Sequence, residues 1–188
     1  NSVKATLIKV GGDADDPIFD QPNVDYRKNA GACAGDLGET SLCLGGTAWL
    51  FCNAVLAPVN EIEPLDYLFV DEAGQVSLAN LVGMSRSTKN IILVGDQMQL
   101  GQPIQGSHPD ESGQSALEYL LQKVATIAPD MGVFLPKTYR MHPDVCALIS
   151  EQVYDGRLQS DESTKRHAID INAEILPIQS GIHFIPVS

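Results

Sequence analysis

The 188-residue chain lacks the sequence patterns of several common classes of protein. Its four cysteines, Cys33, Cys43, Cys52 and Cys146, form no C-x-x-C pair, which argues against a zinc site or a disulfide framework. Buried, reduced thiols in a cytoplasmic protein are therefore expected. The chain has no signal peptide and no apolar run of membrane-spanning length, so no membrane partner is expected.

Positive charge is also scarce. Twelve Lys and Arg residues stand against 24 Asp and Glu residues, which gives a formal net charge of −12. The chain therefore has no general attraction for phosphate backbones, and any nucleic-acid site must depend on local motifs. The acidic stretch "GGDADDPIFDQP" (11–22) predicts a solvated surface loop. A calcium loop is the alternative, although the expected glycine and final glutamate are not in register.

Short apolar runs alternate along the chain with segments of helical pattern. This alternation predicts an α/β fold, and the continuous apolar character of the runs predicts a parallel sheet covered on both faces. The expected strands cover residues 4–10, 41–51 (with a possible break at its glycines), 67–70, 91–95, 132–136 and 181–187. The expected helices cover residues 76–87, 112–125 and 142–154.

Polar residues follow two of these predicted strands. Asp71 and Glu72 come directly after "YLFV", and "DQMQ", with Asp96 and Gln99, follows "IILVG". Adjacent parallel strands lie about 4.8 Å apart, so neighbouring strands would bring these polar ends together at the edge where α/β sheets bind ligands. Two acids at one strand end favour a metal and phosphate site. The alternative is that the acidic pair only caps the next helix.

The motifs "VDEAGQ", "LVGDQMQLGQP" and "TYRMHPDVCALISEQVYDGRL" resemble motifs II, III and IV of the superfamily 1 helicases. The similarity is to the group that contains the RNA-decay helicases and the replication helicase-nucleases, which are AAA-type P-loop NTPases. "GGTAWLF" resembles the motif with which that group contacts the nucleic-acid strand. The chain also resembles bacterial proteins that join such a helicase domain to a RecB-type nuclease, although nothing in these residues shows the nuclease. The resemblance implies an incomplete RecA-like parallel sheet with flanking helices.

The resemblance also implies two domains and a role for each motif residue in the first. Residues 1–135 would be the later part of the first RecA-like domain, and residues 136–188 the beginning of the second. Asp71 would hold Mg²⁺, and Glu72 would act as general base toward the water that attacks ATP. Gln75 and Gln99 would sense the γ-phosphate, and Asp96 would belong to the nucleotide site.

Four further residues receive roles from the same resemblance. Tyr139 would lie against the nucleotide base, and Arg140 would reach the γ-phosphate. Thr47 and Trp49 would contact single-stranded DNA or RNA. Tyr139 could instead be a core aromatic, and Trp49, in an apolar run, fits the core better than a stacking platform. The stretch His142-Pro143-Asp144 indicates a helix start and not a metal site.

One element of the family pattern is missing from these 188 residues. No G-x-x-x-x-G-K-[ST] loop is present, and without its lysine the phosphates of ATP lose their main cradle. We therefore expect the chain to be part of a longer ATP-dependent helicase or translocase and to be inactive alone. A nucleotide-gated or purely structural interaction module on the same scaffold is the main alternative. An unrelated α/β hydrolase is a weaker one, because no G-x-S-x-G turn is present.

Overall fold

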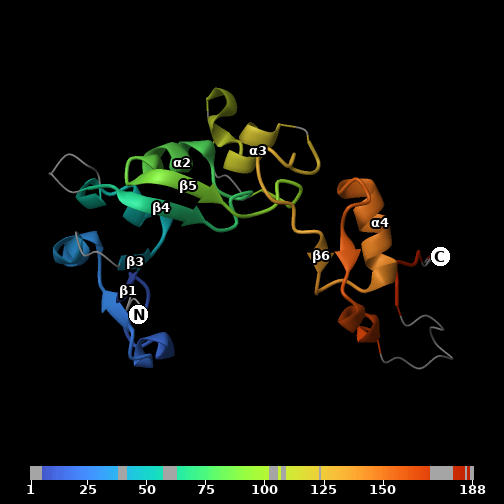
Figure 1. Ribbon diagram of the computed structural model, residues 1–188, viewed down its shortest axis with the longest axis horizontal. Coiled ribbons are helices and arrows are strands. Elements are labelled where there is room, and N and C mark those ends of the chain that lie inside the picture. The colour runs from blue at the N-terminus through green and yellow to red at the C-terminus, as the bar shows by residue number, and fades with distance from the viewer. Residues whose placement is uncertain are drawn as a thin grey trace. The chain divides into compact units, whose positions relative to one another are not determined.

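The computed structural model describes residues 6–37, 42–56, 63–101, 106, 109–122, 124–169, 180–184 and 186. The chain packs as two compact units, Asn1–Leu120 and Leu121–Ser188 (Figure 1). Packing units differ from family domains, so the boundary predicted after residue 135 stays a prediction. The paired strands that the structure describes are parallel, with helices between them, which confirms the α/β class.

The first unit begins with a three-stranded parallel sheet in the order β2-β1-β3. Its strands are β1 (Thr6–Val10), β2 (Val24–Arg27) and β3 (Leu42–Gly45). Ile8 and Val10 are buried, because alternate side chains of β1 point to the same face of the sheet. The sequence does not predict strand β2, because its residues, VDYR, are few and half of them are polar.

The acidic stretch between β1 and β2 is mostly exposed, as predicted, and contains the 3-10 helix η1 (Pro17–Asp20). The Asp16 carboxylate accepts a hydrogen bond from the Ile18 amide at 3.0 Å and pairs with Lys9 at 3.1 Å. The amide and then the Lys9 ammonium lower the pKa of Asp16. Among the described residues, no group of three or more His, Cys, Asp or Glu side chains could hold a metal ion, so nothing supports the calcium alternative.

The 3-10 helix η2 (Ala30–Asp36) is tied back to β2 by one arginine. The Arg27 guanidinium donates two hydrogen bonds to the Asp36 carboxylate, at 2.8 and 2.9 Å, and this pairing lowers the pKa of Asp36. All four cysteines are free, as predicted. The expectation that all are buried is wrong, since two are buried (Cys33 and Cys146) and two are exposed (Cys43 and Cys52).

The predicted strand over residues 41–51 is wrong in its second half. β3 ends at Gly45, and the chain then forms the short helix α1 (Ala48–Phe51) and the 3-10 helix η3 (Ala54–Leu56). Gly46 allows this turn, because a Cβ at that position would press against the Leu50 side chain. The glycine pair therefore separates a strand from a helix within one apolar run.

The middle of the first unit is a parallel strand pair joined by a helix, drawn in green in Figure 1. The elements are β4 (Leu65–Val70), α2 (Leu78–Ser85) and β5 (Thr88–Leu93). On β4, Leu68 and Val70 are buried, whereas Tyr67 and Phe69 are 60% and 67% exposed. The expectation that both faces of these strands are covered is therefore wrong for this chain, because alternate residues remain open to solvent.

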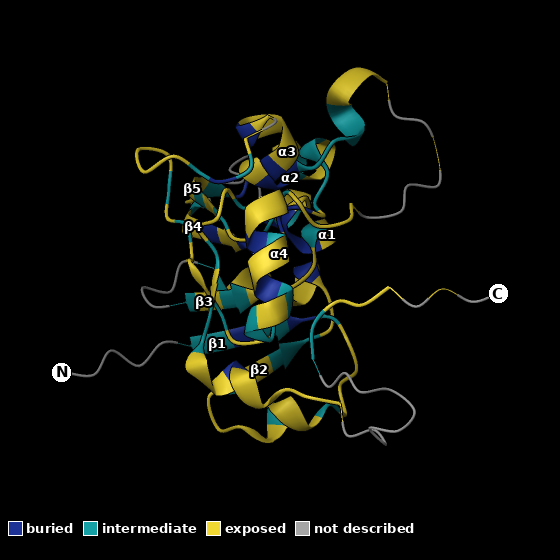
Figure 2. Cartoon of the chain, turned by 90° about the vertical axis from the view of Figure 1, so that its right-hand side faces the viewer, coloured by how far each residue is buried: buried dark blue, intermediate teal, exposed yellow. Residues whose placement is uncertain are grey.

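The remaining helices and strands are short, except for helix α4 (Pro143–Val153). They are η5 (Asp110–Gly113), α3 (Ala116–Leu121), β6 (Lys137–Thr138), α4 (Pro143–Val153), β7 (Gln159–Ser160) and η6 (Glu162–Arg166). α4 matches the predicted helix, while α3 covers only part of residues 112–125. Figure 2 shows that α4 exposes much of one side, and Cys146 and Ser150 are its buried residues. None of the helices among the described residues is long and apolar enough to cross a membrane.

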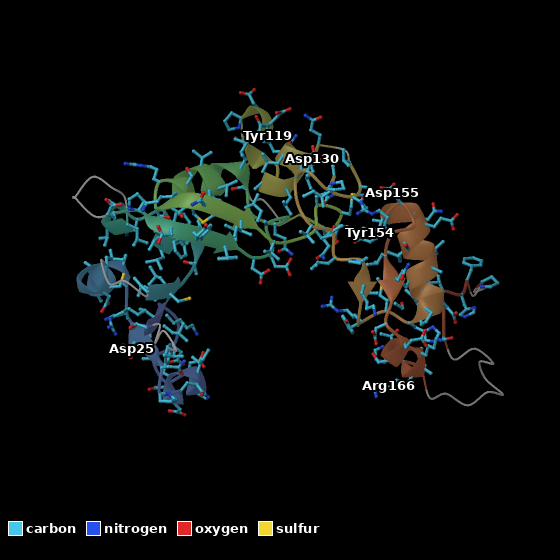
Figure 3. The ribbon with its side chains drawn as sticks, in the orientation of Figure 1. Asp25, Tyr119, Asp130, Tyr154, Asp155 and Arg166 are labelled. Carbon is cyan, nitrogen blue, oxygen red and sulfur yellow. The ribbon has the colours of Figure 1, made fainter. Side chains whose placement is uncertain are left out.

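Residues 132–136 are not a strand, contrary to the prediction. Phe134 instead packs under the Arg157 guanidinium, 4.5 Å from the ring centre, and against Tyr154, which lies beside Asp155 at the end of α4 (Figure 3). Arg157 also donates to the Thr126 hydroxyl at 2.9 Å. The described part of the predicted strand 181–187, residues 181–184 and 186, likewise contains no strand, and residues 185 and 187 lie outside the described residues.

Candidate nucleotide-hydrolysis site

The ends of β4 and β5 lie side by side, as the sequence predicts. Beyond the strand pair, the Ala73 amide donates to the Val94 carbonyl at 2.9 Å, and the Val94 amide donates to the Val70 carbonyl at 2.9 Å. The turn that follows β4 is thus hydrogen-bonded to the turn that follows β5. Asp71, Glu72 and Asp96 are consequently grouped at one edge of the strand pair.

Two glycines allow the backbones of these turns to touch. A Cβ at Gly74 would collide with the carbonyl oxygen of Asp96. A Cβ at Gly95 would lie 2.7 Å from the Ala73 nitrogen and 3.1 Å from the Gly74 nitrogen. Real Cβ atoms do not approach backbone this closely, so glycine is the residue that fits at both positions.

We expect Gly95→Ala to destabilise the chain by about 1–3 kcal/mol, the usual cost of overpacking. The neighbouring atoms belong to the backbone, which cannot rotate away as a side chain can. Urea unfolding of the 188-residue chain measures the effect. Gly101→Ala is the matched control, because a Cβ there has nothing within 4 Å. Equal stability of the two variants would show that the turns are not in contact.

The turn after β4 presents both acidic side chains to solvent. The Asp71 carboxylate accepts a hydrogen bond from the Glu72 amide at 3.0 Å, and Glu72 has a left-handed backbone with φ of +52°. Such a backbone costs an L-residue roughly 1–2 kcal/mol. Ala73 is fully buried and fixes the turn, while Asp71 and Glu72 stay exposed.

The helix-capping alternative for the acidic pair is wrong. α2 is capped by Ser77, whose hydroxyl accepts from the Asn80 amide at 3.3 Å. The segment before α2 is also held by another part of the chain, which the sequence did not reveal. The Leu78 amide donates to the Gln114 carbonyl at 2.9 Å, and the Ala116 amide donates to the Val76 carbonyl at 2.7 Å. These backbone contacts have no side-chain signature in the sequence.

The turn after β5 orients its own polar side chains. The Asp96 carboxylate accepts from the Met98 amide at 2.9 Å and from the Gln99 side-chain amide at 3.4 Å. Gln99 itself is exposed, in the turn that follows β5. Gln75 is also exposed, at the end of the turn that follows β4.

The carboxylates here fit the way proteins bind Mg²⁺. This ion prefers oxygen ligands and usually keeps several waters, binding through one or two carboxylates and the phosphates of a substrate. Asp71 is exposed at the strand end and presents such a carboxylate.

The second unit presents Tyr139 and Arg140 on a short, well-anchored turn after β6. The Arg140 amide donates to the Thr138 hydroxyl at 3.2 Å, and the Ser160 hydroxyl donates to the Met141 carbonyl at 2.8 Å. Tyr139 is 68% exposed, so its interpretation as a core aromatic is wrong. Among the described residues, the Arg140 guanidinium has no hydrogen bond or ion pair and is exposed.

His142 starts a helix, as predicted. It is the N-cap of α4, and its Nδ1 accepts a hydrogen bond from the Asp144 amide at 3.2 Å. Pro143 occupies the first turn, where its missing amide hydrogen is not needed. The His142 ring is thereby used in capping, which supports the prediction that this stretch is not a metal site.

Thr47 and Trp49 lie at the start of α1. Thr47 is the N-cap of that helix but its side chain makes no capping hydrogen bond. Trp49 is 82% exposed, so the interpretation of Trp49 as a core residue is wrong. The neighbouring Leu50 and Phe51 are buried instead.

The chain is similar to known helicase proteins. The model of an AAA domain family matches residues 113–188. The DNA replication ATP-dependent helicase/nuclease dna2 of Schizosaccharomyces pombe is 31% identical over 99 residues, which are 53% of this chain and 7% of that protein. DNA2 of Gallus gallus is 31% identical over 108 residues, 57% of this chain and 11% of that protein.

A plant relative extends the comparison. The probable helicase MAGATAMA 3 of Arabidopsis thaliana is 32% identical over 108 residues, 57% of this chain and 13% of that protein. The chain thus spans only a small part of the length of the curated relatives it matches. The motif turns at the ends of β4 and β5, together with these similarities, agree with the resemblance to the superfamily 1 helicases and with an incomplete RecA-like α/β fold.

Proposed function

We propose that the chain carries part of the ATP-hydrolysing machinery of a nucleic-acid helicase or translocase. The observation that carries this proposal is the backbone contact between the turns after β4 and β5. It holds an acidic pair and an oriented glutamine at one edge of a parallel strand pair, where α/β proteins bind nucleotides.

In this proposal each side chain at the edge has one task. Asp71 holds Mg²⁺, which when bound neutralises charge on the phosphates of ATP. Glu72 takes a proton from the attacking water, because its exposed carboxylate makes no hydrogen bond with the other described residues. Gln99, held by Asp96, and Gln75 present amides that can donate to the γ-phosphate or accept from the water.

Two residues that follow β6 receive the remaining roles in the proposal. Arg140 reaches the γ-phosphate from the second RecA-like domain, with its guanidinium keeping its charge throughout the reaction. Tyr139 stacks against the base of the nucleotide. The proposed domains are residues 1–135 and 136–188. ATP binding would then bring groups from both domains to the same phosphate and couple hydrolysis to domain closure.

The proposed polymer is a single strand of DNA or RNA that contacts Thr47 and Trp49. Relatives named for action on DNA and on RNA both support a nucleic-acid substrate, and they do not show which of the two polymers this chain binds. One is named a 5'-3' DNA helicase, ZGRF1 of Mus musculus, and another a 3'-5' exoribonuclease, HELZ2 of Mus musculus. The net charge of −12 makes binding by residues 1–188 alone weak and sensitive to salt.

An ATPase comparison tests the proposal. A longer protein that contains these residues and a lysine-bearing phosphate loop should hydrolyse ATP with Mg²⁺, and single-stranded DNA or RNA should stimulate it. Residues 1–188 alone should show no turnover above background, because they include no such loop. Release of phosphate from pure material measures both.

Two results would contradict the proposal. Robust Mg²⁺-dependent hydrolysis by residues 1–188 alone would show that the chain is a complete enzyme. A longer protein that binds ATP but never hydrolyses it, with any strand, would favour the nucleotide-gated interaction module.

A further inference from the structure

We propose that His167 is a positioning residue for Arg140 and fixes the main chain from which the guanidinium reaches the phosphate of ATP. The inference rests on the proposed function and adds a residue to that site. His167 lies beyond the last helicase-like motif, which ends at Leu158. Side-chain hydrogen bonds to the turn that carries Arg140, all of them within the second unit, support the inference.

Side chains hold the main chain of Arg140 at both of its polar atoms. The Arg140 amide donates to the Thr138 hydroxyl at 3.2 Å, and the Arg140 carbonyl oxygen lies 3.2 Å from His167 Nδ1. The next carbonyl, that of Met141, accepts from the Ser160 hydroxyl at 2.8 Å. These side chains come from β6, from β7 and from the residue that ends η6. The turn is therefore fixed by three different elements, while the Arg140 side chain stays exposed.

Main-chain contacts of this kind suit an arginine that has to reach a ligand. A guanidinium that is already bonded within the protein must break those bonds before it can meet a phosphate. Among the described residues, Arg140 is bonded only through its main chain, so its place is fixed without using any of its five side-chain donors. Catalytic groups need to be held within about 0.5 Å of the productive position, and supporting hydrogen bonds provide this precision.

His167 is itself anchored by η6, whose last residue, Arg166, is labelled in Figure 3. The His167 amide donates to the Thr164 carbonyl at 3.0 Å. Thr164 is fully buried, and its hydroxyl donates to the Asp161 carbonyl at 2.7 Å. Asp161 is the N-cap of η6, and its amide donates to the Thr138 carbonyl at 2.9 Å. Hydrogen bonds thus connect the base of the imidazole to the strand that precedes the turn.

The contact with the turn determines where the neutral His167 ring carries its proton. A carbonyl oxygen can only accept, so Nδ1 must be the protonated nitrogen. The other two histidines among the described residues require the opposite tautomer. His142 Nδ1 accepts from the Asp144 amide, and His183 Nε2 donates to the Ser180 carbonyl at 2.6 Å. His167 is therefore distinguished from both by the bond it makes.

Nitrogen NMR of the histidine rings tests the contact in the unaltered 188-residue chain. We expect neutral His167 to carry its proton on Nδ1, and neutral His142 and His183 to carry theirs on Nε2. The measurement needs no substitution, so it does not depend on the folding of a variant. A neutral His167 ring protonated on Nε2 could not donate to the turn and would overturn the inference.

Turnover of the longer protein tests whether the contact matters for the reaction. His167→Leu removes the donor, whereas His167→Asn keeps one, because the Asn side-chain nitrogen lies as many bonds from the main chain as Nδ1 does. His167→Leu should lower kcat by about 10- to 100-fold, since a displacement of about 1 Å can cost that much. KM for ATP should change little, because the guanidinium acts on charge that develops in the transition state. His167→Asn should keep most of the turnover.

A double substitution separates the placement of Arg140 from a general effect on the fold. In a protein that already carries Arg140→Ala, His167→Leu should cause no further loss of turnover, because no guanidinium remains to be placed. His183→Leu is the matched control, since His183 is an exposed histidine of the same unit that also donates to a carbonyl. It should leave turnover unchanged. Melting temperatures of the same preparations show whether each variant is folded.

Three kinetic results would overturn the inference. They are normal turnover of His167→Leu, turnover of His167→Asn as slow as that of His167→Leu, and an equal loss from His167→Leu when Arg140→Ala is already present. Failure of the proposed function is a separate result. Normal turnover of Arg140→Ala would refute the role of Arg140 itself, whereas slow turnover of Arg140→Ala beside normal turnover of His167→Leu would refute only the positioning role.

Discussion

Replacing Arg140 with alanine should reduce ATP turnover of the longer protein by about 10³-fold or more, as loss of an arginine finger does. The guanidinium would neutralise charge that develops on the transferring phosphoryl group, and alanine supplies none. Stability should change by no more than about 0.5 kcal/mol, because Arg140 is exposed and, among the described residues, only its backbone is hydrogen-bonded, to Thr138 and His167. Turnover and thermal melting of the same preparations measure the two effects.

Two further variants test whether the guanidinium of Arg140 itself is needed. Arg140→Lys should rescue turnover poorly, since an ammonium keeps the charge but loses the planar fork of donors. Arg166→Ala is the matched control, an exposed arginine of the same unit that lies in η6, outside the proposed site. Normal turnover of Arg140→Ala would rule out its role at the phosphate. A large fall in its melting temperature would identify a structural arginine.

Glu72→Gln should lower turnover by about 10²–10⁴-fold while nucleotide binding is retained. The amide has nearly the shape of the carboxylate but cannot take a proton from water. The substitution does not change the backbone strain at position 72, because glutamine at φ +52° is as unfavourable as glutamate. Turnover and equilibrium binding of ATP, measured on one preparation, distinguish the two steps.

Glycine at the same position provides a second control. Glu72→Gly removes both the carboxylate and the steric cost of the left-handed backbone, so it should abolish turnover without lowering stability. A gain of roughly 1 kcal/mol in the free energy of unfolding would show that strain is stored at the proposed base. If Glu72→Gln instead turned over ATP at the normal rate, Glu72 would not be the base.

The parts of the fold that could be predicted are those in which local pattern and packing agree. β1, β4 and β5 are apolar runs flanked by polar residues, and α2 and α4 begin with capping residues. The run over 41–51 could not be assigned from its pattern, because its apolar residues fit a buried strand as well as a helix. Residues 132–136 have a strand-like composition, but Phe134 packs against Arg157 and no strand in the described part of the chain pairs with them.

The candidate site was predicted in outline for a geometric reason. Carboxyl ends of adjacent parallel strands meet at one edge, so the pairing of β4 with β5 was enough to group Asp71 with Asp96. The left-handed backbone of Glu72 could not be predicted, because glutamate rarely adopts it. The exposure of Trp49 followed from the helix that replaced the second half of a predicted strand.

The close approach of Gly74 to the Asp96 carbonyl couples the movement of the turn after β4 to that of the turn after β5. Their main chains touch without intervening side chains, so displacement of one turn must push the other by a similar distance. The glycines, which have no side chains to change, would set how faithfully one strand end follows the other.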